Sequence, residues 1–456
     1  MKKKILESIL FNKIEWLKII KKKKPLHNFM HLIKKTNNNF KNSLKNNFPA
    51  FIFEIKKTSP SLGKICKNFN IHKIVNSYNK YASAISVITE EKYFHGNIKY
   101  LKKVRKNTNL PILCKDFFID DYQIYLSRYY GADAILLILS ILNNYQYKRF
   151  SRIAKSMNLK ILTEINNVKE LNRAIFLNAE IIGINNRNLN DFSININTTK
   201  ILSPLIPKNK IIISESGIKN NIIVNELKKY VNGFLIGSSV MSENNINLKI
   251  KKIIFGNNKI CGLIKKKDAE ISEKNGAIYG GLIFVKSSKR NISIKNAINI
   301  INYNFLKYIG VFQNEDFYKI KDITNKLNLH AVQLHGNENQ KYINSLKSIL
   351  NKNTKIWKAV CIKNDLPNYK FDNVDKIIFD NYVPGSGNSF NWSILNNINL
   401  KNIFLSGGIN IKNFHNALKF KPYGLDFNSG VEKNGIKNHN KIKKLFNKIK
   451  TTLIKN

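Results

Sequence analysis

The chain has 456 residues, 43% of them hydrophobic, which is enough for two cores of about 200 to 250 residues each. Its 77 Lys and Arg against 29 Asp and Glu give a formal net charge of +48, which ordinarily indicates a nucleic-acid or anionic-membrane partner. The basic residues are mostly lysine and run through the whole length, whereas a protein that reads DNA concentrates its charge and favours arginine, so we expect no nucleic-acid partner.

Residues 1 to about 48 precede the first predicted strand and are predicted to be helical, with Trp16 and Leu17 on an apolar face. We expect this extension to cap the following barrel or its mouth. The start resembles a secretory signal for a few residues, but Glu7 interrupts the apolar segment and no small-residue cleavage site follows. No apolar stretch approaches the ~18 residues needed to cross a bilayer. We therefore expect a cytoplasmic protein with no membrane partner.

Eight short apolar segments follow in the first half, separated by amphipathic segments of helical length. They are continuous Ile, Val, Leu and Phe runs, as expected for parallel strands that are buried on both faces. Strand and helix repeated eight times predict a closed (β/α)₈ TIM barrel, whose active site lies at the carboxyl ends of the strands. The predicted strands are residues 50–55, 82–88, 110–114, 132–139, 160–163, 180–184, 210–214 and 233–236.

Polar residues stand at the ends of these strands. Glu54 and Lys56 end the first strand, Lys115 the third and Glu164 the fifth. Two carboxylates and two lysines therefore point into one mouth, where proximity and partial burial shift pKa values towards neutrality. Gly and Ser turns after the last two strands offer backbone N–H groups to a phosphate. The other candidate residues at the strand ends are Ser59, Asn185, Arg187, Glu215, Ser216, Gly217, Gly237 and Ser238.

Five motifs in strand order resemble indole-3-glycerol phosphate synthase over nearly all of residues 1–255: EIK with SPS from residue 54, ILCKDF from 112, LTE from 162, GINNR from 183 and SESGI from 214. That family cyclises 1-(2-carboxyphenylamino)-1-deoxyribulose 5-phosphate with loss of CO₂ and water. The resemblance implies that Lys115 is the general acid and that Glu164 relays a proton in the dehydration. It also implies that Glu54, Lys56 and Asn185 orient the substrate and that Gly217, Gly237 and Ser238 hold its phosphate.

The residue types suit this chemistry without the family resemblance. Ring closure needs an acid on the carbonyl oxygen, and the resulting hydroxyl must then leave as water. An ammonium performs the first task, and a second acid or base performs the other. The alternative is that the four charged residues form a structural ion-pair network. Their occurrence with the flanking motifs in the right strand order disfavours it.

The second half repeats the pattern with shorter spacing and predicts a second eight-stranded barrel over residues 256–456. The strand ends carry Cys261, Arg290, Gln333 with His335, Asp380, and the glycine turns that contain Gly385-Ser386-Gly387 and Gly407-Gly408. Asp426, Ser429 and Gly430 follow the last strand. The predicted strands are residues 258–262, 279–284, 308–312, 331–334, 355–360, 376–379, 402–405 and 424–427.

This half resembles phosphoribosylanthranilate isomerase, and the order of the two halves matches the fused enzymes of tryptophan biosynthesis. An Amadori rearrangement needs one base and one acid, and a thiolate and a carboxylic acid across one mouth supply both. The resemblance assigns these roles to Cys261 and Asp380, the anthranilate contact to Arg290, and the phosphate to Gly407-Gly408 and Ser429-Gly430. A buried apolar cysteine is the alternative for Cys261, which Asp380 and the KICGL context outweigh. We expect His335 to be a structural residue or one that orients the substrate, and not a catalyst.

The four cysteines, Cys66, Cys114, Cys261 and Cys361, lie far apart and form no metal-ligand or redox pair, as in a reducing compartment. Apart from Cys261, we expect these cysteines to be packing residues. We also expect no metal and no organic cofactor, because acid–base side chains account for both reactions. We expect the protein to be a monomer.

The second half departs from the family at Ile264, Lys265, Lys289 and Pro384. Lysine matches a planar carboxylate or phosphate less well than arginine. Two alternatives therefore stand beside the bifunctional enzyme: a synthase with a decayed isomerase half, and a basic nucleic-acid-binding protein.

Overall fold

The computed structural model describes residues 3–59, 63–66, 69–188, 191–303, 306–383 and 387–454. The chain divides into two compact units, Met1–Lys219 with Ile223–Ile250 and Asn220–Ile222 with Lys251–Asn456. This division falls within helix α12 (Ile246–Phe255), which ends where the sequence places the domain boundary, between residues 255 and 256. No helix among the described residues is long and apolar enough to cross a membrane.

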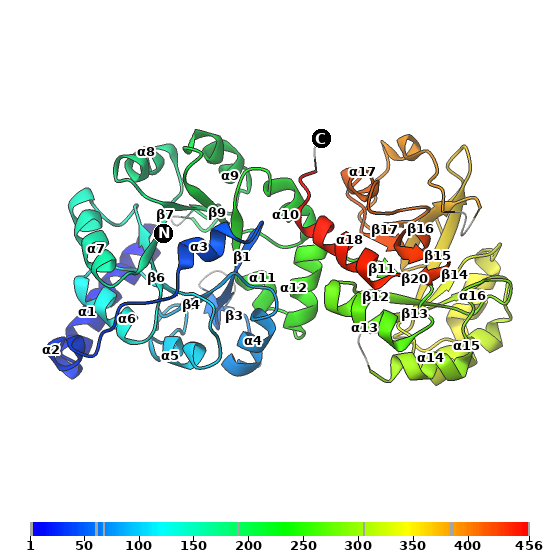
Figure 1. Cartoon of the computed structure of the whole chain (residues 1–456), viewed down its shortest axis with the longest axis horizontal. Helices are drawn as coiled ribbons and strands as arrows, with labels where there is room; N and C mark the ends of the chain where they lie inside the picture. Colours follow the sequence, from blue (N-terminus) through cyan, green and yellow to red (C-terminus); the bar gives the residue numbers. More distant parts are fainter. Residues whose placement is uncertain are drawn as a thin grey trace. The chain divides into compact units, whose positions relative to one another are not determined.

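The first unit is a closed barrel of eight parallel strands in the order β1-β10-β9-β8-β7-β6-β5-β4. The predicted barrel is confirmed, and each predicted strand lies within two residues of an observed one. Helices follow the strands and form the outer layer (Figure 1). The strands are β1 (Ala50–Ile55), β4 (Ala84–Ile88), β5 (Ile112–Lys115), β6 (Ala134–Ile138), β7 (Lys160–Ile165), β8 (Ile181–Asn185), β9 (Ile211–Glu215) and β10 (Gly233–Ile236).

Asparagine, which is abundant in this sequence, begins many of the helices. Asn70, Asn143 and Asn167 each accept a hydrogen bond from a backbone N–H in the first turn of α4, α7 and α8. Such N-caps satisfy donors that the helix itself leaves unpaired. The helices after the strands are α4 (Ile71–Tyr78), α5 (Lys99–Arg105), α6 (Asp121–Tyr129), α7 (Asn144–Ser156), α8 (Val168–Phe176), α9 (Asn197–Leu202), α10 (Asn221–Leu227) and α11 (Ser238–Met241).

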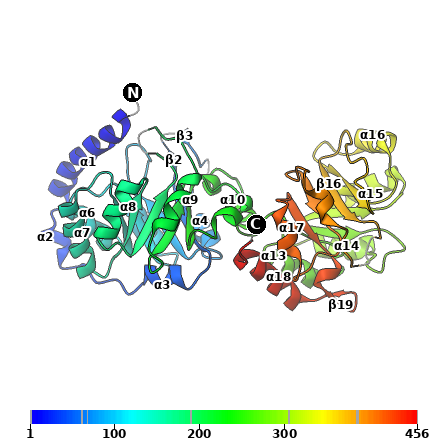
Figure 2. The ribbon, with the colours of Figure 1, turned by 90° about the horizontal axis from the view of Figure 1, so that it is seen from above.

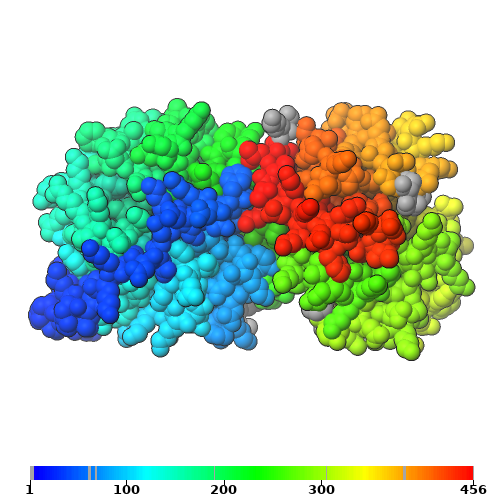
Figure 3. Space-filling model, in the orientation of Figure 1, coloured from blue at the N-terminus to red at the C-terminus, as the bar shows by residue number. Residues whose placement is uncertain are grey.

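The N-terminal extension forms α1 (Lys3–Lys23), α2 (His27–Met30) and α3 (Phe40–Lys45), with non-helical chain between α2 and α3. The helical prediction is therefore correct for α1 and wrong for residues 33–39, where the chain runs along the barrel. Figure 2 shows α1 along one side of the first unit, and Figure 3 shows the extension, in blue, spread over its surface. Leu17 is buried in α1 as predicted.

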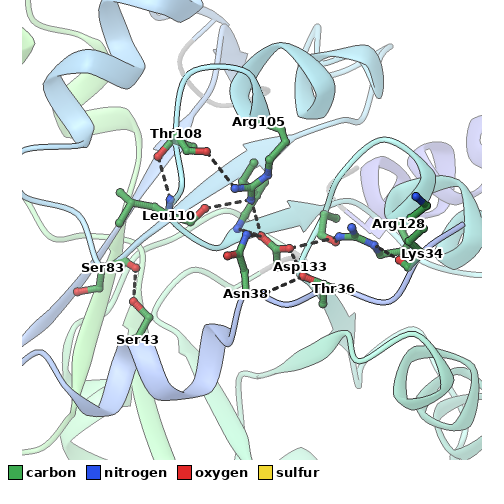
Figure 4. A network of polar contacts seen from close by, with 12 residues as sticks. Lys34, Thr36, Asn38, Ser43, Ser83, Arg105, Thr108, Leu110, Arg128 and Asp133 are labelled. Atoms are coloured by element: carbon green, nitrogen blue, oxygen red, sulfur yellow. Dashed lines mark hydrogen bonds and ion pairs between the residues drawn. The ribbon is translucent and has the colours of Figure 1, made fainter.

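Asp133, just before β6, fastens this extension to the barrel (Figure 4). Its carboxylate accepts hydrogen bonds from the Thr36 hydroxyl, from the Asn38 amide at 3.3 Å and from the backbone N–H of Ile112 at 2.9 Å. Arg105 and Arg128 form ion pairs with the same carboxylate. The carboxylate is buried, so the two guanidinium groups offset the cost of removing its charge from water.

The second unit is also a closed parallel barrel, with its strands in sequence order from β11 to β18. The predicted second barrel is confirmed. The fully described segment 363–375, between β15 and β16, contains no helix. The strands are β11 (Lys259–Ile260), β12 (Tyr279–Ile283), β13 (Lys307–Phe312), β14 (Ala331–Leu334), β15 (Lys355–Ile362), β16 (Lys376–Asn381), β17 (Ile403–Leu405) and β18 (Gly424–Phe427).

Helices cover the second barrel on the outside, and a short hairpin follows its last strand (Figure 1). A single core of buried aliphatic and aromatic residues lies between these helices and the strands. The elements are α13 (Lys266–Asn275), α14 (Ile294–Ile301), α15 (Phe317–Leu327), α16 (Gln340–Ile349), α17 (Phe414–Lys419), α18 (His439–Thr451), β19 (Glu432–Lys433) and β20 (Ile436–Lys437).

Candidate active sites

The period of two along a strand builds the first site. In β1, Ala50 and Ile52 belong to the apolar core of the barrel, and Glu54 is the next residue on the same face. In β9, Ile211 and Ile213 precede Glu215 in the same way. The last inward-facing residue of several strands is thus charged or polar, while the layers below it are apolar.

Lys115 is the centre of this layer. Its Nζ lies 3.2 Å from Glu164 Oε2 and 3.1 Å from Glu215 Oε2. Asn185 Nδ2 donates to the other oxygen of Glu164 at 3.0 Å. The sequence analysis expected two carboxylates in this mouth and assigned Glu215 to the substrate-binding residues. In the structure, Glu215 is a third carboxylate and contacts Lys115 directly.

Glu54 and Lys56 form a second pair, with Nζ 2.8 Å from Oε1. Two glycines leave room for the carboxylates. A Cβ on Gly237 would lie 2.3 Å from Glu54 Oε1, and one on Gly183 would lie 2.1 Å from Glu215 Oε1. A side chain at either position would therefore displace the carboxylate beside it.

Burial and mutual charge shift the pKa values of this cluster. Burial raises the pKa of Glu215 to about 7, against the lowering effect of Lys115. Burial works against the charge of Lys115, but Glu215, Glu164 and Glu54 outweigh it and raise the pKa of Lys115 above its usual value. Lys115 is therefore a charged donor at neutral pH, beside a carboxyl that can hold or release a proton there.

These residues line a cavity of about 630 Å³ at the carboxyl ends of the strands, a size that suits a small-molecule substrate. Ser216 and Gly217 form a turn with φ of +64° and +82°, and both residues line the cavity. Ser238 begins α11, whose free N–H groups suit an anion. Pro60 and Ser61 lie outside the described residues. The remaining predicted residues on the cavity wall are Ser59, Arg187 and Gly237.

The sequence analysis missed the apolar wall of this cavity, which suits an aromatic ring. Leu6 and Ile9 of α1 and Phe94, Phe117 and Phe192 line it. The extension that contains α1 was expected to cap the barrel or its mouth, and the structure places Leu6 and Ile9 on the wall of this site.

The second site is built around Cys261, which follows β11 and is buried. A Cβ on Gly281 of β12 would lie 2.6 Å from Cys261 Sγ and 3.1 Å from Lys259 Cε, so this glycine makes room for both side chains. Lys259 Nζ lies 2.7 Å from Asp426 Oδ2. Asp426 was predicted as a substrate contact, and the structure pairs it with Lys259, which the sequence analysis overlooked.

Asp380 and His335 face each other across this cavity, with 3.5 Å between His335 Nε2 and Asp380 Oδ2. Gln333 lies 3.2 Å from the other ring nitrogen of His335. Burial raises the pKa of Asp380 to about 6. Burial and then Lys259 lower the pKa of His335 to about 4, so the imidazole is neutral at pH 7.

Arg290 is held by Glu432, which accepts from Nε at 2.8 Å and from Nη2 at 2.7 Å. This bidentate pair fixes the guanidinium plane, and Lys437 contacts the same carboxylate. The sequence analysis missed Glu432 and Lys437. Glu432 lies two residues after Gly430, but nothing in the sequence indicates that it reaches Arg290.

The glycine turns of the second site lie close to one another. Gly407 and Gly408 have φ of +80° and +59°, and a Cβ on Gly408 would lie 2.5 Å from Gly387 O. These turns and Ser429 line a cavity of about 660 Å³ with Cys261. A Cβ on Gly430 would lie 2.1 Å from Ile409 O. Pro384, Gly385 and Ser386 lie outside the described residues.

The exposed Lys289 lines this cavity, whereas Lys265 is the N-cap residue that precedes α13. Cys66 and Cys114 are buried as packing residues, and Cys361 is partly buried. Across the described parts of the chain, no group of three His, Cys, Asp or Glu side chains could hold a metal ion.

Each barrel therefore carries acid–base side chains and backbone turns suited to an anion, at the face where (β/α)₈ enzymes bind substrates. Together they define two (β/α)₈-barrel enzymes in one chain. The family model of indole-3-glycerol phosphate synthase matches residues 6–253, and that of N-(5'-phosphoribosyl)anthranilate (PRA) isomerase matches residues 258–448. The chain belongs to the synthase family in its first half and to the isomerase family in its second, and it is a bifunctional lyase and isomerase.

Curated relatives share this arrangement over nearly the whole length. A tryptophan biosynthesis protein TrpCF from Buchnera aphidicola subsp. Acyrthosiphon pisum is 56% identical over 446 residues, which cover 98% of each chain. The TrpCF protein of Salmonella typhi is 45% identical over 428 residues, 94% of this chain and 95% of its own. That of Haemophilus influenzae is 43% identical over 462 residues, 98% and 97% of the two chains.

Proposed function

We propose that the two barrels catalyse consecutive steps of tryptophan biosynthesis. The second barrel isomerises N-(5-phosphoribosyl)anthranilate to 1-(2-carboxyphenylamino)-1-deoxyribulose 5-phosphate. The first barrel cyclises that product to indole-3-glycerol phosphate with loss of CO₂ and water. The observation that carries this proposal is the contact of Lys115 with Glu164 and Glu215 inside one cavity, with Cys261 and Asp380 together in the other.

In the first barrel, Lys115 acts as the general acid on the substrate carbonyl. Glu164, which contacts Lys115 and Asn185, relays a proton when the hydroxyl leaves as water. Glu54 and Lys56 orient the anthranilate carboxylate and the sugar, while Ser59 and Arg187 add contacts at the rim. The turns at Ser216-Gly217 and Gly237-Ser238 bind the phosphate.

In the second barrel, the Cys261 thiolate takes the C2 proton and Asp380 protonates the ring oxygen. With a pKa of about 6, Asp380 still holds a proton in part of the molecules near neutral pH. Arg290, held flat by Glu432, contacts the anthranilate carboxylate. Gly407-Gly408 and Ser429-Gly430 bind the phosphate, and Gln333, His335 and Asp426 support the site.

The intact pairing of Arg290 and the placement of Cys261 and Asp380 favour two working sites over a decayed isomerase. The departures from the family at Lys265 and Lys289 leave Cys261, Asp380 and Arg290 in place. We infer a monomer in the cytoplasm with small phosphosugar anthranilates as partners, and no nucleic-acid partner, membrane partner or cofactor.

Separate assays of the two steps on the purified chain test this function. Both rates should be measurable, and both should survive exhaustive EDTA treatment. A chain with synthase activity but no isomerase activity would establish the decayed-isomerase alternative. Salt-sensitive retention on DNA with neither activity would establish a nucleic-acid-binding protein.

A further inference from the structure

Lys259 is an unusual residue for the interior of a barrel. Its side chain is completely buried, on the second-barrel strand that leads to Cys261. Interior positions of such barrels are normally filled by branched apolar side chains, and a buried ammonium costs several kcal/mol before its partners offset it. The position therefore calls for an explanation beyond packing.

Lys259 and Cys261 are two residues apart, so they share the inward face of the strand. Both lie over Gly281, whose Cβ position is 3.1 Å from Lys259 Cε and 2.6 Å from Cys261 Sγ. On the other side, β18 pairs with β11 so that Lys259 stands opposite Asp426. Asp426 Oδ2 accepts from Lys259 Nζ at 2.7 Å and fixes the ammonium at this depth.

We propose that Lys259 is a positioning residue of the isomerase, whose ammonium, held by Asp426, favours ionisation of the buried Cys261 side chain to the thiolate. The proposal rests on the proposed role of Cys261 as the base. Lys259 does not touch substrate in this account, because Cys261 is among the described residues that line the cavity and Lys259 is not.

The charges around Cys261 agree with this role. Burial raises the pKa of the Cys261 thiol above its usual value, and Asp426 raises it further. Lys259 is the strongest influence that lowers it, so the pKa would be higher still without this ammonium. Lys437 of β20 also lowers it, and Arg290 after β12 interacts with it. The charged or titratable groups that face Cys261 or line the same cavity are Lys259, Asp426, Arg290, Lys437, Lys289, Asp380, His335 and Glu432.

The proposal makes two changes act in opposite directions. Lys259→Met removes the cation and keeps the length of the side chain, so Cys261 should ionise at higher pH. Asp426→Asn removes the anion that competes with the thiolate for Lys259, so Cys261 should ionise at lower pH. A residue that acted only by packing would not give shifts of opposite sign.

The experiment is alkylation of the full chain with iodoacetamide as a function of pH, with modification of Cys261 followed by peptide mass spectrometry. We expect the midpoint to rise by about one pH unit or more in Lys259→Met, which is a roughly tenfold slower reaction near pH 7, and to fall in Asp426→Asn. The acid limb of the isomerase kcat/KM profile should move in the same directions.

Lys358→Met is the matched control, because Lys358 is a buried lysine of the same barrel paired with Glu338 at 2.9 Å. The alkylation midpoint of Cys261 in this variant should equal that of the unmutated chain.

An unchanged midpoint in Lys259→Met, or an upward shift in Asp426→Asn, would overturn the proposal. If Lys259→Met does not fold, Asp426→Asn decides alone, and the absence of a downward shift refutes the inference. The assignment of the base is tested separately by the isomerase rate of Cys261→Ala. A normal rate there would refute the proposed base, while the alkylation midpoints would still report whether Lys259 ionises the thiol.

Discussion

Lys115 and Cys261 each lie beside charged side chains. The neighbours of Lys115 come from other strands, whereas Cys261 has one neighbour on its own strand and one on the last strand of its barrel. Lys115 meets Glu164 of β7 and Glu215 of β9, whereas Cys261 is packed beside Lys259 and Asp426. In both sites a buried charge is balanced by an opposite one within hydrogen-bond distance. Such arrangements cost folding energy and are typical of sites where chemistry requires them.

Lys115→Ala and Cys261→Ala should separate the two activities. Each removes a proposed general acid or base, which costs roughly 10² to 10⁴ in rate, and each lies in a different barrel. We expect Lys115→Ala to lose the synthase and keep the isomerase, and Cys261→Ala to do the reverse, in assays of each step on the purified variants. Loss of both activities in either variant would indicate a folding defect instead.

Two glycines give a reciprocal pair of steric tests. A Cβ on Gly183 would lie 2.1 Å from Glu215 Oε1, and a Cβ on Gly281 would lie 2.6 Å from Cys261 Sγ. Misplacement of a catalytic group by about 1 Å can cost about 10² in rate. Gly183→Ala should therefore reduce the synthase kcat/KM with a normal isomerase, and Gly281→Ala the isomerase with a normal synthase; each variant is the other's control. Unaltered kinetics in both would contradict the tight packing.

Asp380→Asn should abolish the isomerase and stabilise the second unit at neutral pH. Burial raises the pKa of Asp380 from 3.8 to about 6, so the folded state binds this proton more tightly than the unfolded state. The stability that the protonated Asp380 carboxyl contributes is then complete below about pH 3.8 and is lost as the pH rises through about 6. The loss is at most about 3 kcal/mol.

Denaturant unfolding at pH 5 and pH 7.5 measures this effect, with Trp357 and Trp392 as reporters in a Trp16→Phe background. The stability gain of Asp380→Asn should be larger at pH 7.5 than at pH 5. An equal gain at both values would show that the carboxyl does not titrate in this range.

The sequence revealed the candidate catalytic residues because each stands at the end of an apolar strand, and their catalytic roles stay predictions. Glu54, Lys115 and Cys261 were found in this way, and the structure brings each of them into a cavity. The sequence did not show which charged side chains contact each other. Lys259 is visible in KICGL, two residues before Cys261, but its contact with Asp426 depends on the closure of the barrel between its first and last strands.

At the scale of elements, the extension and the barrel are joined at both ends. Lys13 of α1 pairs with Asp116 after β5, with 2.7 Å between Nζ and Oδ1, and both side chains are buried. Towards the amino ends of the strands, Asp133 gathers Thr36, Arg105 and Arg128 (Figure 4). Parallel strands were predictable from continuous apolar runs, whereas the path of residues 33–39 was not, because it is fixed by these distant partners.

Asp133→Asn should destabilise the first unit by about 3 kcal/mol or more, because it leaves two partly buried guanidinium groups without their carboxylate. Trp16 lies in this unit and reports its unfolding in a background where Trp357 and Trp392 are phenylalanine. Asp121→Asn is the matched control: its partner Arg149 is exposed, so the cost should stay below about 1 kcal/mol. An equal loss of unfolding free energy in the two variants would show that the Asp133 network stabilises the first unit no more than an exposed ion pair does.

At the scale of the whole molecule, two complete barrels follow one another in one chain. Each has eight strands, its own cavity and its own set of acid–base residues. The sequence showed this because the series of strands repeats. The exact division could not be read from it, because α12 continues without a break across the point where compactness divides the chain.

Separate expression of residues 1–255 and 256–456 should give two folded and active fragments. The cut follows the last residue of α12 and leaves each series of strands and each set of site residues intact, which is what an independently folding domain requires. We expect the synthase kcat/KM of the first fragment and the isomerase kcat/KM of the second to stay within a few-fold of the full chain. Cooperative unfolding of each fragment and the two rates, measured alone and after mixing, check this. A first fragment that is inactive alone and recovers its activity on mixing would show that the synthase barrel depends on the isomerase barrel for its fold.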